Sequence, residues 1–289
     1  MVTAFSRRDF LVGAALAALT TVVRAQTPRR IVTLEWAETE IALSLGLIPV
    51  GVADLAGYRQ WVKVENDRLS NAVDVGGRQQ PSLEALMHLK PDLIITSALR
   101  HGAIAARLNE IAPTVLLDTD SDKSDFYANM QSSLLTAGTA FDREAEAVAE
   151  WQSFKSHLAL ARDQRSSPAT KILVAQPLPG IARLRIFTSN SAVMTTLTKA
   201  GFAEGVQRGA QSFGFTTFGL EDLATLSPDT HLCLLEDALP EELAASALWP
   251  ILPMVAGKQV FTIGRDIWPF GSTRSMLRLL DRVMHVLPN

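Results

Sequence analysis

Six aromatic side chains lie in polar or glycine-containing segments, where a residue of a buried core is not expected. They are Tyr58, Trp61, Phe213, Phe215, Trp268 and Phe270. Their segments, residues 57–61, 212–217 and 266–271, are predicted to be loops, and loops commonly carry binding residues. Each ring taken alone has a second interpretation, because large aromatic side chains also bury well in an ordinary core. As a set they indicate a concave site with aromatic walls.

Arg78 is a cation that can join such a site. It stands in the segment Gly76–Pro81, where two glycines and a proline predict a turn that exposes the side chain. A guanidinium presents a fixed fork of donors that suits paired or negative oxygens. The other interpretation is a solvated surface arginine. The residue pattern leaves both roles open.

No residues are arranged as a recognised catalytic or metal centre. The chain has no Gly-x-Ser-x-Gly, P-loop, His-Glu-x-x-His or Gly-x-Gly-x-x-Gly motif. Its five histidines include no pair three or four residues apart, so we predict no metal site made by protein ligands. We therefore predict a protein that is not an enzyme, has no catalytic residues and needs no cofactor. The alternative of a different class is an exported α/β hydrolase that uses Ser191 or Ser272.

The first residues have the pattern of an export signal. Arg7 and Arg8 precede an uncharged stretch from Phe10 to Val23, which is followed by a small-residue cleavage site ending at Ala25. The segment Ser6–Leu11 fits the twin-arginine pattern, although an ordinary secretory signal can have the same outline. We predict a twin-arginine signal peptide over residues 1–25 and a mature protein in the periplasm.

Charge and hydropathy restrict the partners of the mature chain. The signal carries three arginines and one aspartate, so its removal takes the formal net charge from -3 to -5. That charge argues against binding to nucleic acid. No later segment approaches the ~20 consecutive apolar residues that span a bilayer. We expect a soluble protein that is a monomer.

The elements that must position these residues fall into two α/β halves. The stretch from residue 141 to 162 contains neither glycine nor proline and is predicted to be one long helix. Short apolar strands alternate with helical patterns on both sides of it. We predict an α/β fold of two lobes with a ligand cleft between them. The predicted limits are residues 26–140 for the N-terminal lobe, 141–165 for the linking helix and 166–289 for the C-terminal lobe.

An internal repeat supports two related lobes. The segment Leu83–Asp92 aligns without gaps to Leu220–Asp229, with six identical positions at a constant offset of 137. Each copy is predicted to be a short helix that ends at Pro-Asp and is followed by an apolar strand. Glu84 and Glu221 occupy equivalent positions in the first turn of these helices.

Together these features resemble a known family, the periplasmic ferric-hydroxamate siderophore-binding proteins of the helical-backbone class of ABC importer receptors. The resemblance spans nearly the whole mature chain and is strongest over residues 31–36, 45–54, 58–61, 73–78 and 111–113. It implies capture of an Fe(III)-siderophore chelate and its delivery to an inner-membrane ABC permease. The chelate supplies all the ligands of the iron, so the resemblance implies no direct metal ligand from the protein.

The resemblance also implies roles for single residues. Arg78 matches an arginine that donates hydrogen bonds to the hydroxamate oxygens, and Glu84 and Glu221 match the acids that dock on the permease. The pocket aromatics of the family fall on Trp61, the Phe213 region, Trp268 and Phe270, and Phe213 replaces a tryptophan. Where the family can carry a ligand-binding tyrosine, this chain reads Leu99-Arg100-His101-Gly102, and either Arg100 or His101 can supply donors instead.

The cargo has alternatives within the same fold, namely cobalamin, haem or a catecholate siderophore. A catecholate chelate carries substantial negative charge and should need several basic groups. The sequence offers Arg78, with Arg59 or Arg100 in addition, so a ferric hydroxamate is favoured over a catecholate. Aromatic clefts also suit haem and cobalamin.

Overall fold

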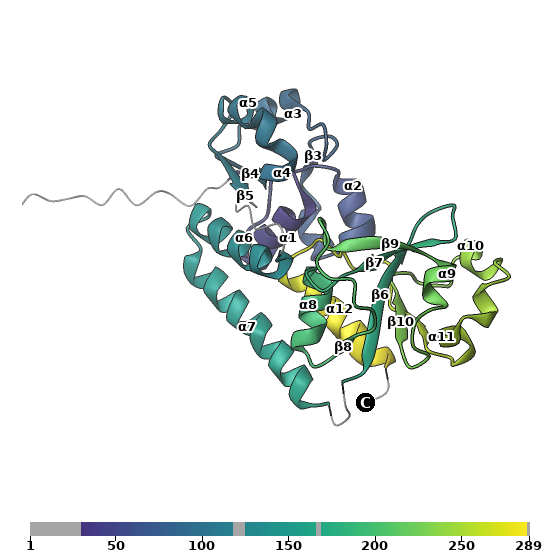
Figure 1. Cartoon of the computed structure of the whole chain (residues 1–289). Coiled ribbons are helices and arrows are strands. Elements are labelled where there is room, and N and C mark those ends of the chain that lie inside the picture. The colour runs from purple at the N-terminus through teal and green to yellow at the C-terminus, as the bar shows by residue number, and fades with distance from the viewer. Residues whose placement is uncertain (1–29, 118–124, 166–168, 288–289) are drawn as a thin grey trace, which may run out of the picture.

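A computed structural model describes residues 30–117, 125–165 and 169–287 of the chain (Figure 1). The expected signal peptide, residues 1–25, lies outside the described residues. Within those ranges no helix combines the length and the apolar character that crossing a bilayer requires.

The N-terminal half is built on a parallel sheet of five strands in the order β3-β2-β1-β4-β5. Every residue of the two central strands, β1 and β4, is buried, because helices and loops cover both faces of the sheet. The strands are β1 (Ile31–Thr33), β2 (Gly51–Val52), β3 (Val73–Asp74), β4 (Leu93–Ser97) and β5 (Thr114–Leu117). The α-helices are α1 (Trp36–Ser44), α2 (Leu55–Gly57), α3 (Leu83–Leu89), α4 (Ala98–His101) and α5 (Ala105–Asn109).

The C-terminal half has a mixed sheet in the order β11-β10-β6-β7-β9, with β8 beside β6. Strands β7 and β9 run antiparallel to their neighbours, and the other pairs are parallel. The strands are β6 (Lys171–Pro177), β7 (Arg183–Phe187), β8 (Ala203–Glu204), β9 (Phe215–Gly219), β10 (His231–Leu234) and β11 (Val260–Thr262). The α-helices are α8 (Ala192–Lys199), α9 (Leu220–Leu223), α10 (Glu241–Ala244), α11 (Pro253–Ala256) and α12 (Thr273–Val286).

Two longer helices lie between the sheets in the sequence: α6 (Phe126–Ala140) follows the first sheet, and α7 (Glu144–Asp163) leads into the second. Asp142, with φ at 56°, makes the turn between them. Helix α7 is the long diagonal helix of Figure 1, and it packs on α6, α8 and α12. Its buried residues recur every three or four positions and so form one apolar stripe: Ala147, Trp151, Phe154, Leu158 and Ala161. The prediction of an α/β fold with two lobes joined by one long helix is confirmed.

The two lobes share one hydrophobic core. A single cluster of buried residues includes Ile95 from β4, Trp151 and Phe154 from α7, Val174 from β6 and Met276 from α12. Packing is therefore continuous from the first sheet through the connecting helix to the last helix. Apolar burial in this shared cluster therefore holds the lobes together, in addition to the chain connection between them.

The internal repeat corresponds to equivalent elements in the two lobes. In the first copy α3 precedes β4, and in the second α9 precedes β10, and each of these strands is second from an edge of its sheet. The first helix is longer and ends at Leu89, followed by Lys90 as the C-cap with φ of 46°. Glu84 and Glu221 are both exposed in the first turn of their helices.

Candidate functional site: a cleft between the two lobes

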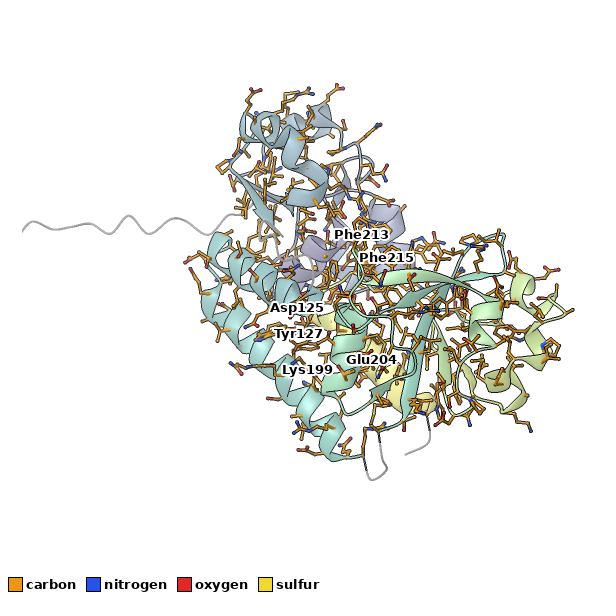
Figure 2. All side chains as sticks on the ribbon, viewed as in Figure 1. Asp125, Tyr127, Lys199, Glu204, Phe213 and Phe215 are labelled. Atoms are coloured by element: carbon orange, nitrogen blue, oxygen red, sulfur yellow. The ribbon has the colours of Figure 1, made fainter. Side chains whose placement is uncertain are left out.

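A cleft of about 560 Å³ lies between the lobes, and both lobes and α6 contribute to its walls. From the N-terminal lobe it is lined by residues that follow the carboxyl ends of β1 and β4, which is the usual ligand-binding edge of a parallel sheet. Its principal side chains are Glu35, Arg78, Leu99, Arg100, Phe126, Met130, Arg185, Phe213, Phe215, Trp268 and Phe270. Figure 2 shows Phe213 and Phe215 where the two lobes meet.

The wall from the C-terminal lobe is a chain of aromatic rings. The ring centroids are 6.1 Å apart for Phe213 and Phe215, 5.9 Å for Phe215 and Phe270, and 5.5 Å for Phe270 and Trp268. Phe213 keeps 55% of its surface exposed, so ordinary core packing does not explain it. The predicted aromatic wall is therefore present for these four residues.

Arg78 is held against the opposite side of the cleft by a turn that its own sequence determines. Gly76 has φ of 92°, a conformation that favours glycine, and it forms a bridge to Pro81. The Ser82 amide donates to the Val75 carbonyl oxygen at 2.8 Å and closes the turn. The guanidinium of Arg78 then lies 4.1 Å from the ring centroid of Trp36 and 5.2 Å from that of Trp268. The interpretation of Arg78 as a solvated surface arginine is wrong.

Glu35 pairs with both arginines of this wall. Arg78 donates from Nε to Glu35 Oε2 at 2.9 Å and also pairs through Nη2. Arg100 pairs with the other carboxylate oxygen of Glu35 through its Nε. Burial raises the pKa of Glu35, and the two guanidinium groups oppose that shift only in part. The wall therefore presents two cations that share one buried anion.

The segment after β4 places Arg100, and not His101, in the cleft. Residues 98–101 form the short helix α4, which turns the two side chains in different directions. His101 is buried, with Nδ1 2.6 Å from the Thr96 hydroxyl oxygen, and burial lowers its pKa. The expectation that His101 might contact a ligand is a misassignment, because its ring packs inside the N-terminal lobe.

Tyr58 and Trp61 also lie outside the cleft, because the predicted loop 57–61 is helical. Asp54 accepts a hydrogen bond from the Gly57 amide at 3.1 Å and starts α2, which continues into a π-helical turn over Tyr58–Val62. Tyr58 is fully buried, and its hydroxyl donates to the Val64 carbonyl oxygen at 3.0 Å. Trp61 packs at the edge of the same cluster under the Arg265 guanidinium.

Several lining residues were not predicted from the sequence. Arg185 comes from β7, whose alternation of arginines with Leu184 and Ile186 is a strand signal that was available. Phe126 and Met130 come from α6, for which Asp125 provides the N-cap. Glu35 lies in a stretch that carried the family resemblance, but its pairing with Arg78 spans 43 positions.

The two serines of the hydrolase alternative lie at the N-termini of helices. Ser191 caps α8, since its hydroxyl donates to the Thr188 carbonyl oxygen at 2.8 Å and accepts from the Met194 amide at 3.0 Å. Ser272 is buried at the start of α12. In the ranges that the structure describes, neither hydroxyl is hydrogen-bonded to a histidine. The arrangement of a nucleophile with its base is not formed there.

Comparisons with known proteins agree on one family. The family model described as periplasmic binding protein matches residues 31–267. The iron(3+)-hydroxamate-binding protein FhuD of Escherichia coli is 29% identical over 290 residues, covering 96% of both chains. The Fe(3+) dicitrate-binding periplasmic protein FecB of Escherichia coli is 27% identical over 246 residues, covering 84% of this chain and 79% of its own.

The fold has a close counterpart among solved structures. The crystal structure of the Fe3+–Desferal-bound siderophore-binding protein FhuD from Vibrio cholerae superposes with a TM-score of 0.81. The two chains are 24% identical, and the match covers 90% of this chain and 97% of the other.

Proposed function

The chain belongs to the periplasmic binding protein family, and from that premise we propose that it captures a ferric hydroxamate siderophore in the periplasm and delivers it to an inner-membrane ABC importer. We include in this proposal export by a twin-arginine signal over residues 1–25. The observation that carries it is the position of Arg78, whose guanidinium packs against the rings of Trp36 and Trp268 and lines a cleft with aromatic walls.

The chemistry of the cargo fits these walls. Three hydroxamates fill the coordination sphere of Fe(III) with oxygen atoms, so the protein has to bind only the outer surface of the chelate. Phe213, Phe215, Trp268 and Phe270 offer apolar faces to its carbon chains. Arg78 and Arg100 offer donors to its negative oxygens. The relative in Escherichia coli that binds iron(3+)-hydroxamate supports the same cargo.

The proposal is tested by titrating the purified mature protein with iron-loaded ligands while tryptophan fluorescence is followed. We expect saturable quenching with a ferric trihydroxamate and weaker responses with a ferric catecholate, haem and cobalamin. Quenching by another ligand at lower concentration than any hydroxamate would assign the cleft to that ligand. No response to any hydroxamate would exclude the proposal.

We further propose that Glu84 and Glu221 dock on the permease, one from each lobe. Both carboxylates are exposed, and they occupy equivalent positions on α3 and α9. Glu84 borders a shallow depression with Arg30, Met87 and His88, which gives the N-terminal docking surface a concave shape. Exposed charges of this kind steer association and set orientation. Charge reversal at either position, Glu84→Arg or Glu221→Arg, should reduce import into permease-containing vesicles while chelate binding is retained.

A further inference from the structure

Arg185 differs from the other arginines of the cleft in having no acidic partner among the residues that the structure describes. It lines the cleft from β7, and its guanidinium lies 4.5 Å from the ring centroid of Phe215 and 5.7 Å from that of Phe270. Nη1 donates to the amide oxygen of Gln176 at 2.8 Å. No carboxylate among the described residues forms an ion pair with it, and burial alone shifts its pKa, downward.

The arginines on the wall from the N-terminal lobe differ from Arg185 in how their charge is compensated. Arg78 and Arg100 share the carboxylate of Glu35, so part of their charge is compensated inside the protein. Two phenylalanine rings partly shield Arg185 from water, and within the described ranges its one side-chain acceptor is the neutral amide of Gln176. A partly buried cation without a counter-ion costs free energy unless something that binds the site brings one.

The charge of the cleft indicates how much negative charge that partner carries. Among the described lining residues there are three arginines, Arg78, Arg100 and Arg185, against two glutamates, Glu35 and Glu38. One positive charge is therefore left over. A neutral chelate leaves it uncompensated, and a chelate with several negative charges overcompensates it.

We propose that Arg185 binds a carboxylate at the periphery of the siderophore, and that the cleft therefore selects ferric hydroxamate chelates with one net negative charge. This inference rests on the proposed function and names the class of hydroxamate within it. A guanidinium fork matches the two oxygens of a carboxylate, which explains why an arginine suits this position. The contact with the face of Phe215 and the hydrogen bond to Gln176 hold the side chain in place before the ligand arrives.

The test uses one linear ferric trihydroxamate in three forms that differ only at a terminal amine. The free ammonium carries one positive charge, the acetylated form is neutral and the succinylated form carries one carboxylate. Affinities are measured for the natural protein and for Arg185→Gln, Arg185→Lys and Arg183→Gln. Arg183 lies on the same strand and is exposed outside the cleft, so its variant removes the same charge without touching the site.

We expect the natural protein to bind the succinylated form about tenfold more tightly than the acetylated form, and the ammonium form most weakly. Arg185→Gln should remove this preference by weakening binding of the succinylated form alone. Arg185→Lys should keep part of the preference, and Arg183→Gln should keep all of it. Equal weakening of all three forms by Arg185→Gln, or no preference in the natural protein, would overturn the inference. Failure of all three forms to bind the natural protein would instead overturn the proposed function.

Discussion

The carboxylate of Glu40 accepts a hydrogen bond from the backbone amide of Ser275 at 2.9 Å, although the two residues are 235 positions apart. The same carboxylate accepts from the Ser272 amide at 3.0 Å and from the Ser275 hydroxyl at 2.5 Å. The first amides of a helix have no partner within it, so the Glu40 side chain from α1 supplies an acceptor at the N-terminus of α12, where Ser272 is the N-cap residue. A fully buried group of the N-terminal lobe thus anchors the C-terminal helix directly behind the cleft.

Removal of this carboxylate should destabilise the protein strongly. Glu40→Ala leaves two buried amides and a hydroxyl without an acceptor, and we expect the free energy of unfolding to fall by about 2–4 kcal/mol. Glu40→Gln keeps one accepting oxygen and should lose less. Urea unfolding measures the difference, with Glu110→Ala on the exposed end of the N-terminal lobe as the control. Equal stability of Glu40→Ala and Glu110→Ala would contradict the capping role.

Gly271 should not tolerate a side chain. A Cβ at this position would lie 2.5 Å from the Ser275 hydroxyl oxygen and 2.6 Å from Glu40 Oε2, and both atoms are held in buried hydrogen bonds. We expect Gly271→Ala to cost about 1–3 kcal/mol of stability through overpacking. Gly102→Ala is the matched control, because a Cβ there meets no atom within 4 Å. The thermal unfolding midpoints of both variants measure this cost. A Gly271→Ala protein as stable as Gly102→Ala would disprove overpacking at Gly271.

Arg78→Ala should weaken binding of a ferric trihydroxamate by about 1.5–3 kcal/mol, the scale of a charge-assisted hydrogen bond. The loss of binding free energy should exceed that caused by Arg107→Ala, since Arg107 is exposed on α5 and lies outside the cleft. Calorimetric titration of both variants gives the comparison. Unchanged affinity in Arg78→Ala would remove this arginine from the binding site.

Binding should strengthen as the pH falls through the titration of Glu35. Burial raises the pKa of this carboxyl, so the folded protein takes up its proton at a higher pH than the unfolded chain does. Its contribution to stability is accordingly present below about pH 4.3 and is lost as the pH rises through the folded-state pKa. Protonation also releases Arg78 and Arg100 toward the ligand oxygens.

The acetylated ferric trihydroxamate suits this measurement, because its terminal group does not titrate. Its affinity for the natural protein should rise on acidification, whereas Glu35→Gln should bind tightly at every pH. The two pH profiles are compared by fluorescence titration. Parallel profiles would show that Glu35 does not control the arginines.

Trp268 should account for most of the fluorescence response. The chain has five tryptophans, all within the described ranges, and Trp268 is the one that lines the cleft. Trp268→Phe should keep an aromatic face and so bind within a few-fold of the natural affinity, yet lose most of the quenching. Trp249→Phe, buried in the C-terminal lobe, should keep the quenching. Full quenching in Trp268→Phe would mean that the ligand lies elsewhere.

Local sequence patterns predicted those helices and strands whose conformation depends mainly on their own residues. The long helix α7 followed from a stretch without glycine or proline, and β5 from a short apolar run. The segment 57–61 was predicted to be a loop, because Arg59 and Gln60 made it look polar. In the π-helical turn those two side chains point outward while Tyr58 and Val62, four positions apart, point inward. Phe215 likewise lies in β9 and not in a loop, because Gly214, directly before the strand, made the segment 212–217 look like a loop.

The electrostatics of the cleft could not be predicted in the same way. The turn around Arg78 depends on neighbouring residues only, and its glycines and proline predicted it. The pairing of Glu35 with Arg78 and Arg100 depends on three segments that meet only when the sheet forms. That no acidic partner of Arg185 lies within residues 30–117, 125–165 and 169–287 is a property of its whole surroundings, so no pattern along β7 could reveal it.

The core shared by the two lobes bears on how well the proposed importer can distinguish the chelate-loaded protein from the empty one. We call these two states the full and the empty carrier. Ile95, Trp151 and Met276 belong to one packed cluster, so we expect the lobes to rock only slightly about α7. A receptor discriminates between two states only by its different affinity for them. With little change in shape, we expect an empty carrier to occupy the permease almost as well as a full one. Uptake should therefore follow the proportion of carriers that are filled, and added empty carrier should slow it.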